Sequence, residues 1–181
     1  CTGSLGDPVL KIDFGNGVSS YPFTAPGYQQ TTNSCPNDGQ YSITTFQSDC
    51  GRQWHTVRAD HTGGGAFMMV NASNNPGDFF LQTVSSLCPN TTYEFSAWIL
   101  NVVNNPGLIK PNLTFRVEST SGTILNQYLT GDIGVHSQPT WEPYGFNFTT
   151  GPGVNSVILR ITNNAPGGMG NDLALDDIQF R

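Results

Sequence analysis

Four aspartates stand where a carboxylate needs a partner. Asp176 and Asp177 interrupt an apolar strand near the C-terminus, and a carboxylate inside a strand requires a cation or several hydrogen-bond donors. Asp13 ends an early strand beside glycines, and Asp60 opens a glycine-rich loop. Hard oxygen ligands from distant segments suit calcium, which accepts about six to eight oxygens in loose geometry. The sequence therefore predicts a structural calcium site at these acids, with capping of backbone N–H groups or pairing with arginine as the alternative.

Aromatic and arginine side chains supply the groups that recognise sugars. A sugar ring packs its apolar face on a flat aromatic ring, and its hydroxyls meet amides, carboxylates or guanidinium groups. Trp98 falls off the apolar alternation of its strand, and Trp54 lies in a polar stretch, so both are candidate platforms. Arg116 and Arg160 fall opposite the apolar positions of their strands. We predict these four residues as ligand-binding, with burial in the core as the alternative for both tryptophans.

Catalysis is the rival class of function. Glycoside hydrolysis needs two carboxylates that flank one site, and Glu94 and Glu118 are the pair that neighbouring strands could bring face to face. Solvation or pairing with arginine is the alternative for both. His55, His61 and His136 have no nucleophile motif to serve. We therefore predict a protein without enzymatic activity.

The elements that must position these residues are strands. Short runs rich in Val, Ile, Phe, Tyr and Thr alternate with Gly, Pro and Asn turns, and no helical periodicity is present. This pattern predicts an all-β fold, a two-sheet antiparallel β-sandwich or jelly roll, with residues 1–181 as one binding module. The runs are Val9–Phe14, Ala66–Asn71, Phe79–Val84, Tyr93–Asn101, Leu113–Glu118, Tyr144–Thr149 and Val157–Thr162.

Alternation within the strands separates a buried face from an exposed one. Apolar residues recur at every second position of Tyr93–Asn101 and Leu113–Glu118, so these positions pack between the sheets. The opposite parity carries Ser96 and Trp98 in the first strand and Arg116 in the second, and Arg160 follows by the same rule. The pattern predicts one polar sheet face that carries all four side chains.

Composition excludes several classes of partner. Charged residues make up 11% of the sequence, against roughly 25% in an average globular protein. The net charge of −6 would repel phosphate backbones, and no cluster of Lys and Arg offsets it, so we expect no nucleic-acid partner. No apolar run approaches the roughly 20 residues that span a bilayer. The chain starts at Cys1 without a leader, which we interpret as a module excised from a larger secreted protein.

Four cysteines occur without a Cys-x-x-C pair or a histidine at zinc-ligand spacing. Disulfide bonds are therefore the better interpretation, and they indicate an oxidising compartment. The segment from Cys35 to Cys50 is short and rich in turn residues, which favours its closure into a loop. Cys1 and Cys88 then pair by default, unless Cys1 bonds or carries a lipid outside this chain and leaves Cys88 free.

Two segments resemble MAM domains. The run ADHTGGGAFMMV, residues 59–70, resembles their "DHT" segment, and DLALDDI, residues 172–178, resembles their last strand. Ile12, Asp13 and Phe14 stand where those domains begin with an acidic, aromatic strand, and Trp141 stands where their penultimate hairpin carries a tryptophan. This resemblance implies a module for adhesion or protein contact.

The strand YEFSAWILN, residues 93–101, and the Asp-Asp-Ile ending also resemble galactose-binding-like jelly rolls and carbohydrate-binding modules of secreted surface proteins. That resemblance implies glycan binding and a structural metal between the N-terminal and C-terminal strands. It also implies a secreted or cell-surface location. A glycan is therefore the expected partner, and contact with a protein surface, as in a MAM-type domain, is the alternative.

Overall fold

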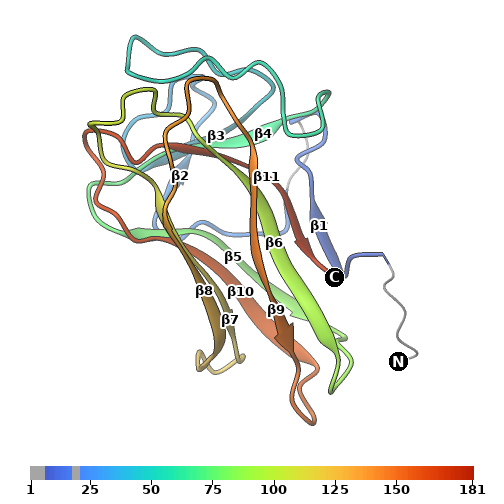
Figure 1. Cartoon of the computed structure of the whole chain (residues 1–181). Helices are drawn as coiled ribbons and strands as arrows, with labels where there is room; N and C mark the ends of the chain where they lie inside the picture. The colour runs from blue at the N-terminus through green and yellow to red at the C-terminus, as the bar shows by residue number, and fades with distance from the viewer. Residues whose placement is uncertain (1–6, 18–20) are drawn as a thin grey trace.

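The computed structural model describes residues 7–17 and 21–181, and these residues form two stacked β-sheets without a helix (Figure 1). One sheet has seven strands in the order β2-β3-β4-β11-β6-β9, with β1 paired to β11. The other has four strands in the order β5-β10-β7-β8. All strand pairs are antiparallel except β2 with β3. The predicted two-sheet jelly roll is confirmed.

The strand bounds follow the turns of the sequence. The seven-stranded sheet contains β1 (Leu10–Ile12), β2 (Gln29–Gln30), β3 (Gln40–Thr44), β4 (Phe67–Asn71), β6 (Thr92–Asn101), β9 (Glu142–Thr149) and β11 (Leu173–Phe180). The four-stranded sheet contains β5 (Gly77–Ser85), β7 (Asn112–Glu118), β8 (Ile124–Asp132) and β10 (Ser156–Asn163). The strands β2, β3 and β8 have no counterpart among the predicted runs, and β8 is a mostly exposed edge strand without an apolar face of its own.

Aromatic side chains from both sheets fill the space between them. Phe95 of β6 lies 5.3 Å from Phe115 of β7 between ring centroids, edge to face, and it also packs against Phe80 and Phe180. All four are fully buried. The alternation of β6 and β7 predicted Phe95 and Phe115 as core positions, and the structure confirms both.

A second apolar cluster lies on the outer side of the seven-stranded sheet. The loop between β3 and β4 folds over that side and buries Trp54 and Val57 against outward-facing residues such as Met69 and Ala174. Their neighbours Met68 and Leu175 point to the main core. The strands β4 and β11 are therefore apolar on both faces. The described part of the chain contains no helix that is long and apolar enough to cross a membrane.

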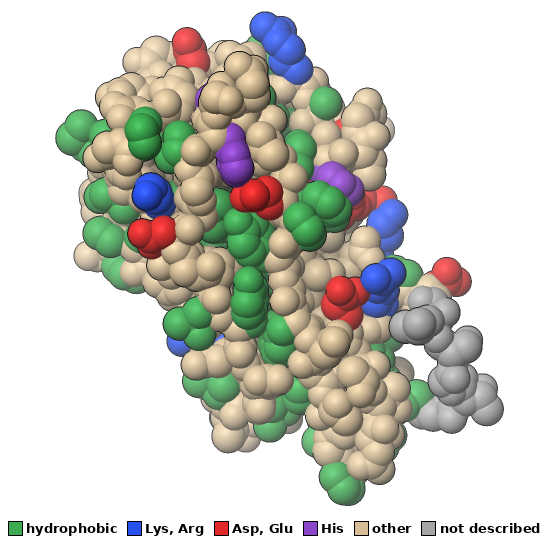
Figure 2. All heavy atoms as spheres, in the orientation of Figure 1, with side chains coloured by type: hydrophobic (Ala, Val, Ile, Leu, Met, Phe, Trp, Pro, Cys, Tyr) green, Lys and Arg blue, Asp and Glu red, His purple; other side chains and the backbone are tan. Residues whose placement is uncertain are grey.

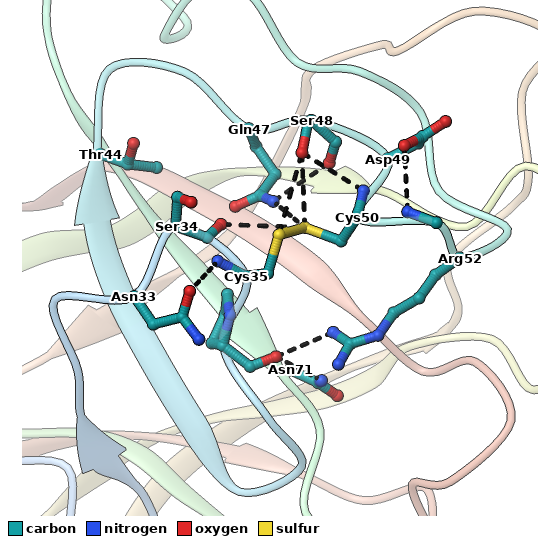
Figure 3. Close-up of a disulfide and its surroundings, with 12 residues drawn as sticks. Asn33, Ser34, Cys35, Thr44, Gln47, Ser48, Asp49, Cys50, Arg52 and Asn71 are labelled. Carbon is teal, nitrogen blue, oxygen red and sulfur yellow. Dashed lines mark hydrogen bonds between the residues drawn. A yellow bond between two sulfur atoms is a disulfide. The ribbon is translucent and has the colours of Figure 1, made fainter.

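The predicted disulfide between Cys35 and Cys50 is present and closes the loop after β2 onto the loop after β3 (Figure 3). Gln47 and Ser48 surround the sulfur atoms with hydrogen bonds. Cys1 lies outside the described residues, so the predicted bond between Cys1 and Cys88 stays a prediction. No cysteine that the structure describes is free.

Replacing Cys35 and Cys50 together by serine is expected to lower the free energy of unfolding by about 3 kcal/mol. The bond joins residues 15 positions apart, and a loop of that length restricts the unfolded chain by about that amount. Urea denaturation measures the difference. The exposed neighbour Ser34→Ala keeps the bond and should change stability by less than about 0.5 kcal/mol. Equal stability of the double variant and the wild type would contradict the prediction.

Candidate functional site

The predicted metal ligands gather around one pocket on the outer side of the seven-stranded sheet. Asp13, Asp60 and Asp177 line a cavity of about 280 Å³, which we call the carboxylate pocket. Asp176 lies beside it, and its Oδ2 accepts the backbone N–H of His61 at 3.0 Å. Acids from both ends and the middle of the described chain are therefore neighbours in space.

Asp60 organises the glycine-rich loop that forms one wall of the carboxylate pocket. Its Oδ1 accepts the backbone N–H groups of Gly63 and Gly64 at 2.6 and 2.7 Å, and its Oδ2 accepts the hydroxyl of Thr62 at 2.8 Å. Burial disfavours the charged form, but these donors outweigh it and hold the pKa of Asp60 below its ordinary value. A Cβ at Gly65 would lie 2.8 Å from Asp60 Oδ2, so only glycine lets the loop close this tightly.

Asp176 is a buried carboxylate with weaker compensation. It is 1% exposed, and burial, reinforced by repulsion from Asp177 and Asp60, raises its pKa to about 7. A bulge in the β11–β6 pairing gives Asp177 a φ of 46° and directs its N–H onto Asp176 Oδ1 at 2.8 Å. Among the residues that the structure describes, neither Asp60 nor Asp176 forms a salt bridge with Lys or Arg. Lys11 lines the carboxylate pocket as well and pairs with Asp13 at 3.2 Å, so the pocket contains more carboxylates than cationic side chains.

Within residues 7–17 and 21–181, no three side chains of His, Cys, Asp or Glu are arranged to hold a metal ion by themselves. Any cation in the carboxylate pocket would need further oxygen donors. Gly15 lines the same pocket, and its carbonyl oxygen faces the glycine-rich loop, where it accepts the N–H of Ala66 at 2.7 Å. The oxygen atoms of this pocket are chemically suited to calcium, with backbone carbonyls or water completing the set, and the ammonium of Lys11 lines the same pocket.

His61 links the carboxylate pocket to Trp98. Its backbone N–H binds Asp176, and its Nδ1 lies 2.7 Å from Asp177 Oδ2. Its ring stacks on the Trp98 indole with centroids 3.6 Å apart and an interplanar angle of 15°. Trp98 projects from the outer face of β6 and is partly exposed. One face of this predicted platform is therefore already covered by a histidine.

A second cavity, of about 390 Å³, opens between the loops before β4, between β6 and β7, and between β10 and β11. We call it the loop-end cleft. The guanidinium carbon of Arg52 lies 4.7 Å from the centroid of the Trp54 ring, and Trp54 Nε1 donates to Asp172 Oδ2 at 2.8 Å. Leu108 and Met169 form its apolar side, and Met169 is 66% exposed. The cleft thus combines polar and apolar walls.

Asp172 contributes to the lining of the loop-end cleft although it is 5% exposed. Its Oδ1 accepts the backbone N–H of Ala72 at 3.0 Å, and its Oδ2 accepts Trp54. Burial raises its pKa to about 6, and the two donors and the charge of Arg52 only partly oppose this. The loss of either donor would therefore further disfavour the ionised form of this carboxyl and raise its pKa.

Trp54 does not present its ring to solvent. It is 3% exposed and packs in the outer apolar cluster, with Arg52 over its ring. Its polar surroundings in the sequence suggested exposure, but the loop folds back on the sheet and buries it. At the loop-end cleft, Trp54 therefore positions Arg52 and Asp172 and does not offer an open ring face to a ligand.

The predicted single polar face is wrong. Trp98 belongs to β6 of the seven-stranded sheet, whereas Arg116 and Arg160 belong to β7 and β10 of the four-stranded sheet, on the opposite side of the sandwich. Arg160 donates to both carboxylate oxygens of Glu118 at 2.9 and 3.0 Å and also pairs with Asp78. It is therefore held by ion pairs. A ligand role for Arg116 and Arg160 stays a prediction for that other face.

The carboxylate pair considered for hydrolysis is also separated. Glu94 lies in β6 and Glu118 in β7, so the two acids project from different sheets and cannot flank one bond. Glu94 pairs with Arg181 at 2.8 Å, which agrees with the alternative that this acid pairs with an arginine. Sequence reasoning missed Arg52 and Asp172 as parts of a cleft. No strand alternation pointed to them, because Arg52 lies in a turn-and-bend segment and meets Asp172 only in the folded chain.

Comparison with known proteins supports the fold. No protein-family model and no curated protein matches the sequence. The CBM22-1 xylan-binding domain of Paenibacillus barcinonensis Xyn10C is 16% identical with a TM-score of 0.56, over 99% of this chain and 97% of that one. A cyclase from Fischerella sp. TAU is 13% identical with a TM-score of 0.61, over 93% and 92%. At such identities the likeness establishes the β-sandwich alone.

A third neighbour is the enzymatically active domain of tailspike protein 4 of bacteriophage CBA120. It is 13% identical with a TM-score of 0.53, and the match covers 93% of this chain but 21% of the tailspike chain. The chain therefore spans about a fifth of that protein. Because binding modules and enzymes share the fold, the fold does not decide between the two classes. The resemblance to MAM domains stays a prediction.

Substituting Trp54→Phe is expected to destabilise the protein more at pH 8 than at pH 4.5. In the wild type, the pKa of Asp172 is about 6, above its ordinary value of roughly 3.9, so this carboxyl contributes stability that is complete below about pH 4 and lost as the pH rises through 6. Removing the indole N–H leaves the buried carboxylate with the Ala72 N–H as its remaining donor, and the lost hydrogen bond costs about 1.5–3 kcal/mol when Asp172 is ionised.

Urea denaturation at the two pH values measures this difference. Trp141→Phe is the matched control, because Trp141 Nε1 donates to the carbonyl of Ala59 at 3.4 Å, where no carboxylate is involved. Its effect should not change with pH. A Trp54→Phe cost that is the same at both pH values would contradict the assigned role of Asp172.

Proposed function

We propose that this protein is a non-catalytic carbohydrate-binding module whose loop-end cleft holds a sugar residue. The observation that carries the proposal is the composition of the cleft walls. Arg52, Gln53 and Asp172 offer donors and acceptors, and Leu108 and Met169 offer apolar surface beside them. A sugar ring presents the same combination of hydroxyls and apolar C–H groups.

Charge further favours a neutral ligand. Arg52 and Asp172 carry opposite charges within one cleft, so an anion or a cation would meet one attractive and one repulsive partner. Figure 2 shows a visible surface made mostly of uncharged side chains and backbone, with acidic and basic groups sparse and scattered. The fold of a xylan-binding domain is also consistent with a polysaccharide ligand.

The setting of the module supports a secreted or cell-surface role. The disulfide Cys35–Cys50 is typical of proteins from oxidising compartments. Glycan binding there would serve adhesion or attachment to a polysaccharide. A protein-contact domain of the MAM type is the second candidate, favoured by the DHT and Asp-Asp-Ile motifs at Asp60–Thr62 and Asp176–Ile178.

A glycan array followed by calorimetry tests the proposal. We expect binding to a neutral glycan, weakened at least 10-fold by Arg52→Ala and by Gln53→Ala, because a lost charged or amide contact costs about 1.4 kcal/mol or more. Arg116→Ala, on the four-stranded sheet, is the control and should keep full affinity. Loss of binding in Arg116→Ala alone would move the site to that sheet. A silent array would favour the protein-contact function.

We further propose a structural calcium ion in the carboxylate pocket. Asp13, Asp60 and Asp177 would hold it, with Asp176 close by and the carbonyl of Gly15 as a further oxygen. Calcium would offset the negative charge of Asp60, Asp176 and Asp177, which the Lys11–Asp13 pair leaves without a Lys or Arg partner among the described residues. It would also tie the end of β1, the loop before β4 and the strand β11 to one another.

Chelation with EDTA is therefore expected to lower the melting temperature of protein prepared with calcium. Free calcium at 100-fold above its dissociation constant would stabilise the fold by about 2.7 kcal/mol. Asp60→Asn should remove the calcium-dependent part of the shift, whereas Asp132→Asn, at the exposed end of β8, should keep it. An unchanged melting temperature together with no metal by elemental analysis would refute the calcium site.

A further inference from the structure

A third cavity lies on the outer face of the seven-stranded sheet, beyond the part that the loop before β4 covers. It has a volume of about 290 Å³ and is lined by β6, β9 and β11 and the residue after β11. We call it the sheet groove. It shares no lining residue with the loop-end cleft, and it shares Asp177 with the carboxylate pocket.

Small residues lie in and beside the floor of the sheet groove, which Ser96 and Ala97 line. Ser96 of β6 is paired with Gly145 of β9. A Cβ at Gly145 would lie 2.5 Å from the carbonyl oxygen of Phe95 and 2.6 Å from the Cβ of Ser96, so β9 packs too closely here for any side chain. The sheet therefore carries no large side chain at Ser96 and Gly145, between the larger side chains of Trp98 and Glu94.

An apolar wall bounds one end of the sheet groove. Trp98 and Pro143 are partners across β6 and β9 and both line the groove. The stack of His61 on Trp98, at 3.6 Å, fixes the indole, and His61 is itself held by Asp177 at 2.7 Å. The aromatic ring is thus preorganised, so little rotamer freedom would be lost when a ligand packs against it.

Polar side chains bound the other end and one side. Glu94 and Arg181 form an ion pair at 2.8 Å, and both are partly exposed, so each retains hydrogen-bonding capacity toward the groove. Gln179 of β11 is the partner of Ser96 and adds an amide. The groove therefore places a carboxylate, a guanidinium and an amide opposite an apolar wall.

This arrangement selects the chemical class of the ligand. The backbone groups of β6 are used on both sides, by β11 and by β9, so a peptide that lies over β6 could not bind by adding a strand. Recognition must come from side chains and ring surfaces, as with sugars. Asp177 and Glu94 disfavour an anionic chain. We propose that the sheet groove is a second binding site, for a segment of a neutral polysaccharide.

A second site would change how the module holds a polymer. The proposal does not depend on the loop-end cleft, because the residues are separate. If both sites bind, two contacts with one polysaccharide surface raise the overall avidity without any new contact at either site. A module that is weak for short oligosaccharides would then bind the polymer more tightly.

Titration of isotope-labelled protein with cellohexaose, xylohexaose and mannohexaose, followed by NMR, tests the sheet groove. At least one sugar is expected to shift the signals of Trp98, Gln179 and the backbone of Gly145. Ser96→Gln places a larger side chain in the floor of the groove. The affinity obtained from these shifts should fall at least 10-fold, and the melting temperature should stay unchanged. Thr83→Gln, an exposed position of β5 on the other sheet, is the matched control and should leave them intact.

Arg52→Ala separates this proposal from the proposed function of the loop-end cleft, because it should leave the groove shifts unchanged. Trp98→Ala should abolish them. The sheet groove is refuted as a sugar site if these hexasaccharides shift signals only at the loop-end cleft, or nowhere. It is also refuted if Ser96→Gln binds them at the groove as tightly as the wild type.

Discussion

The structure depends on the burial of three carboxylates, two in β11 and one at the residue before it. This strand lies in the middle of the seven-stranded sheet, and Asp172, Asp176 and Asp177 are each at most 5% exposed. A buried carboxylate is tolerated only when donors or a cation reach it. The donors come from the segment that lies over the sheet, through the indole of Trp54 and the backbone and ring of His61. The need to satisfy these acids therefore holds that segment in place.

The position of the covering segment in turn creates the candidate sites. Where this segment covers the sheet, the guanidinium of Arg52 stacks on the ring of Trp54. The loop-end cleft forms there, between this segment and the loops that join β6 to β7 and β10 to β11. Where it ends, the ring of His61 reaches Trp98 and leaves the rest of the sheet face open. Loss of one buried donor would thus disturb both the stability of β11 and the binding surfaces around it.

The shared fold explains why site geometry has to decide the class of function. Structures of similar fold include a xylan-binding domain and a cyclase, at 16% and 13% identity. In this chain Glu94 and Glu118 are separated by the thickness of the sandwich, and each is paired with an arginine. The surfaces that remain open offer hydrogen bonds beside apolar walls, and this combination is the basis of the proposed glycan binding.

The sequence by itself determined the all-β class, most strand positions, the core aromatics and the Cys35–Cys50 bond, because each follows from alternation or short-range loop closure. It also identified Asp13, Asp60, Asp176 and Asp177 as a group, through motifs at separate places. Only the tertiary structure decided that Trp98 and Arg116 lie on opposite layers and that Trp54 is buried. Alternation reports the two faces of one strand, whereas sheet membership and loop coverage arise from pairing between residues far apart in the chain.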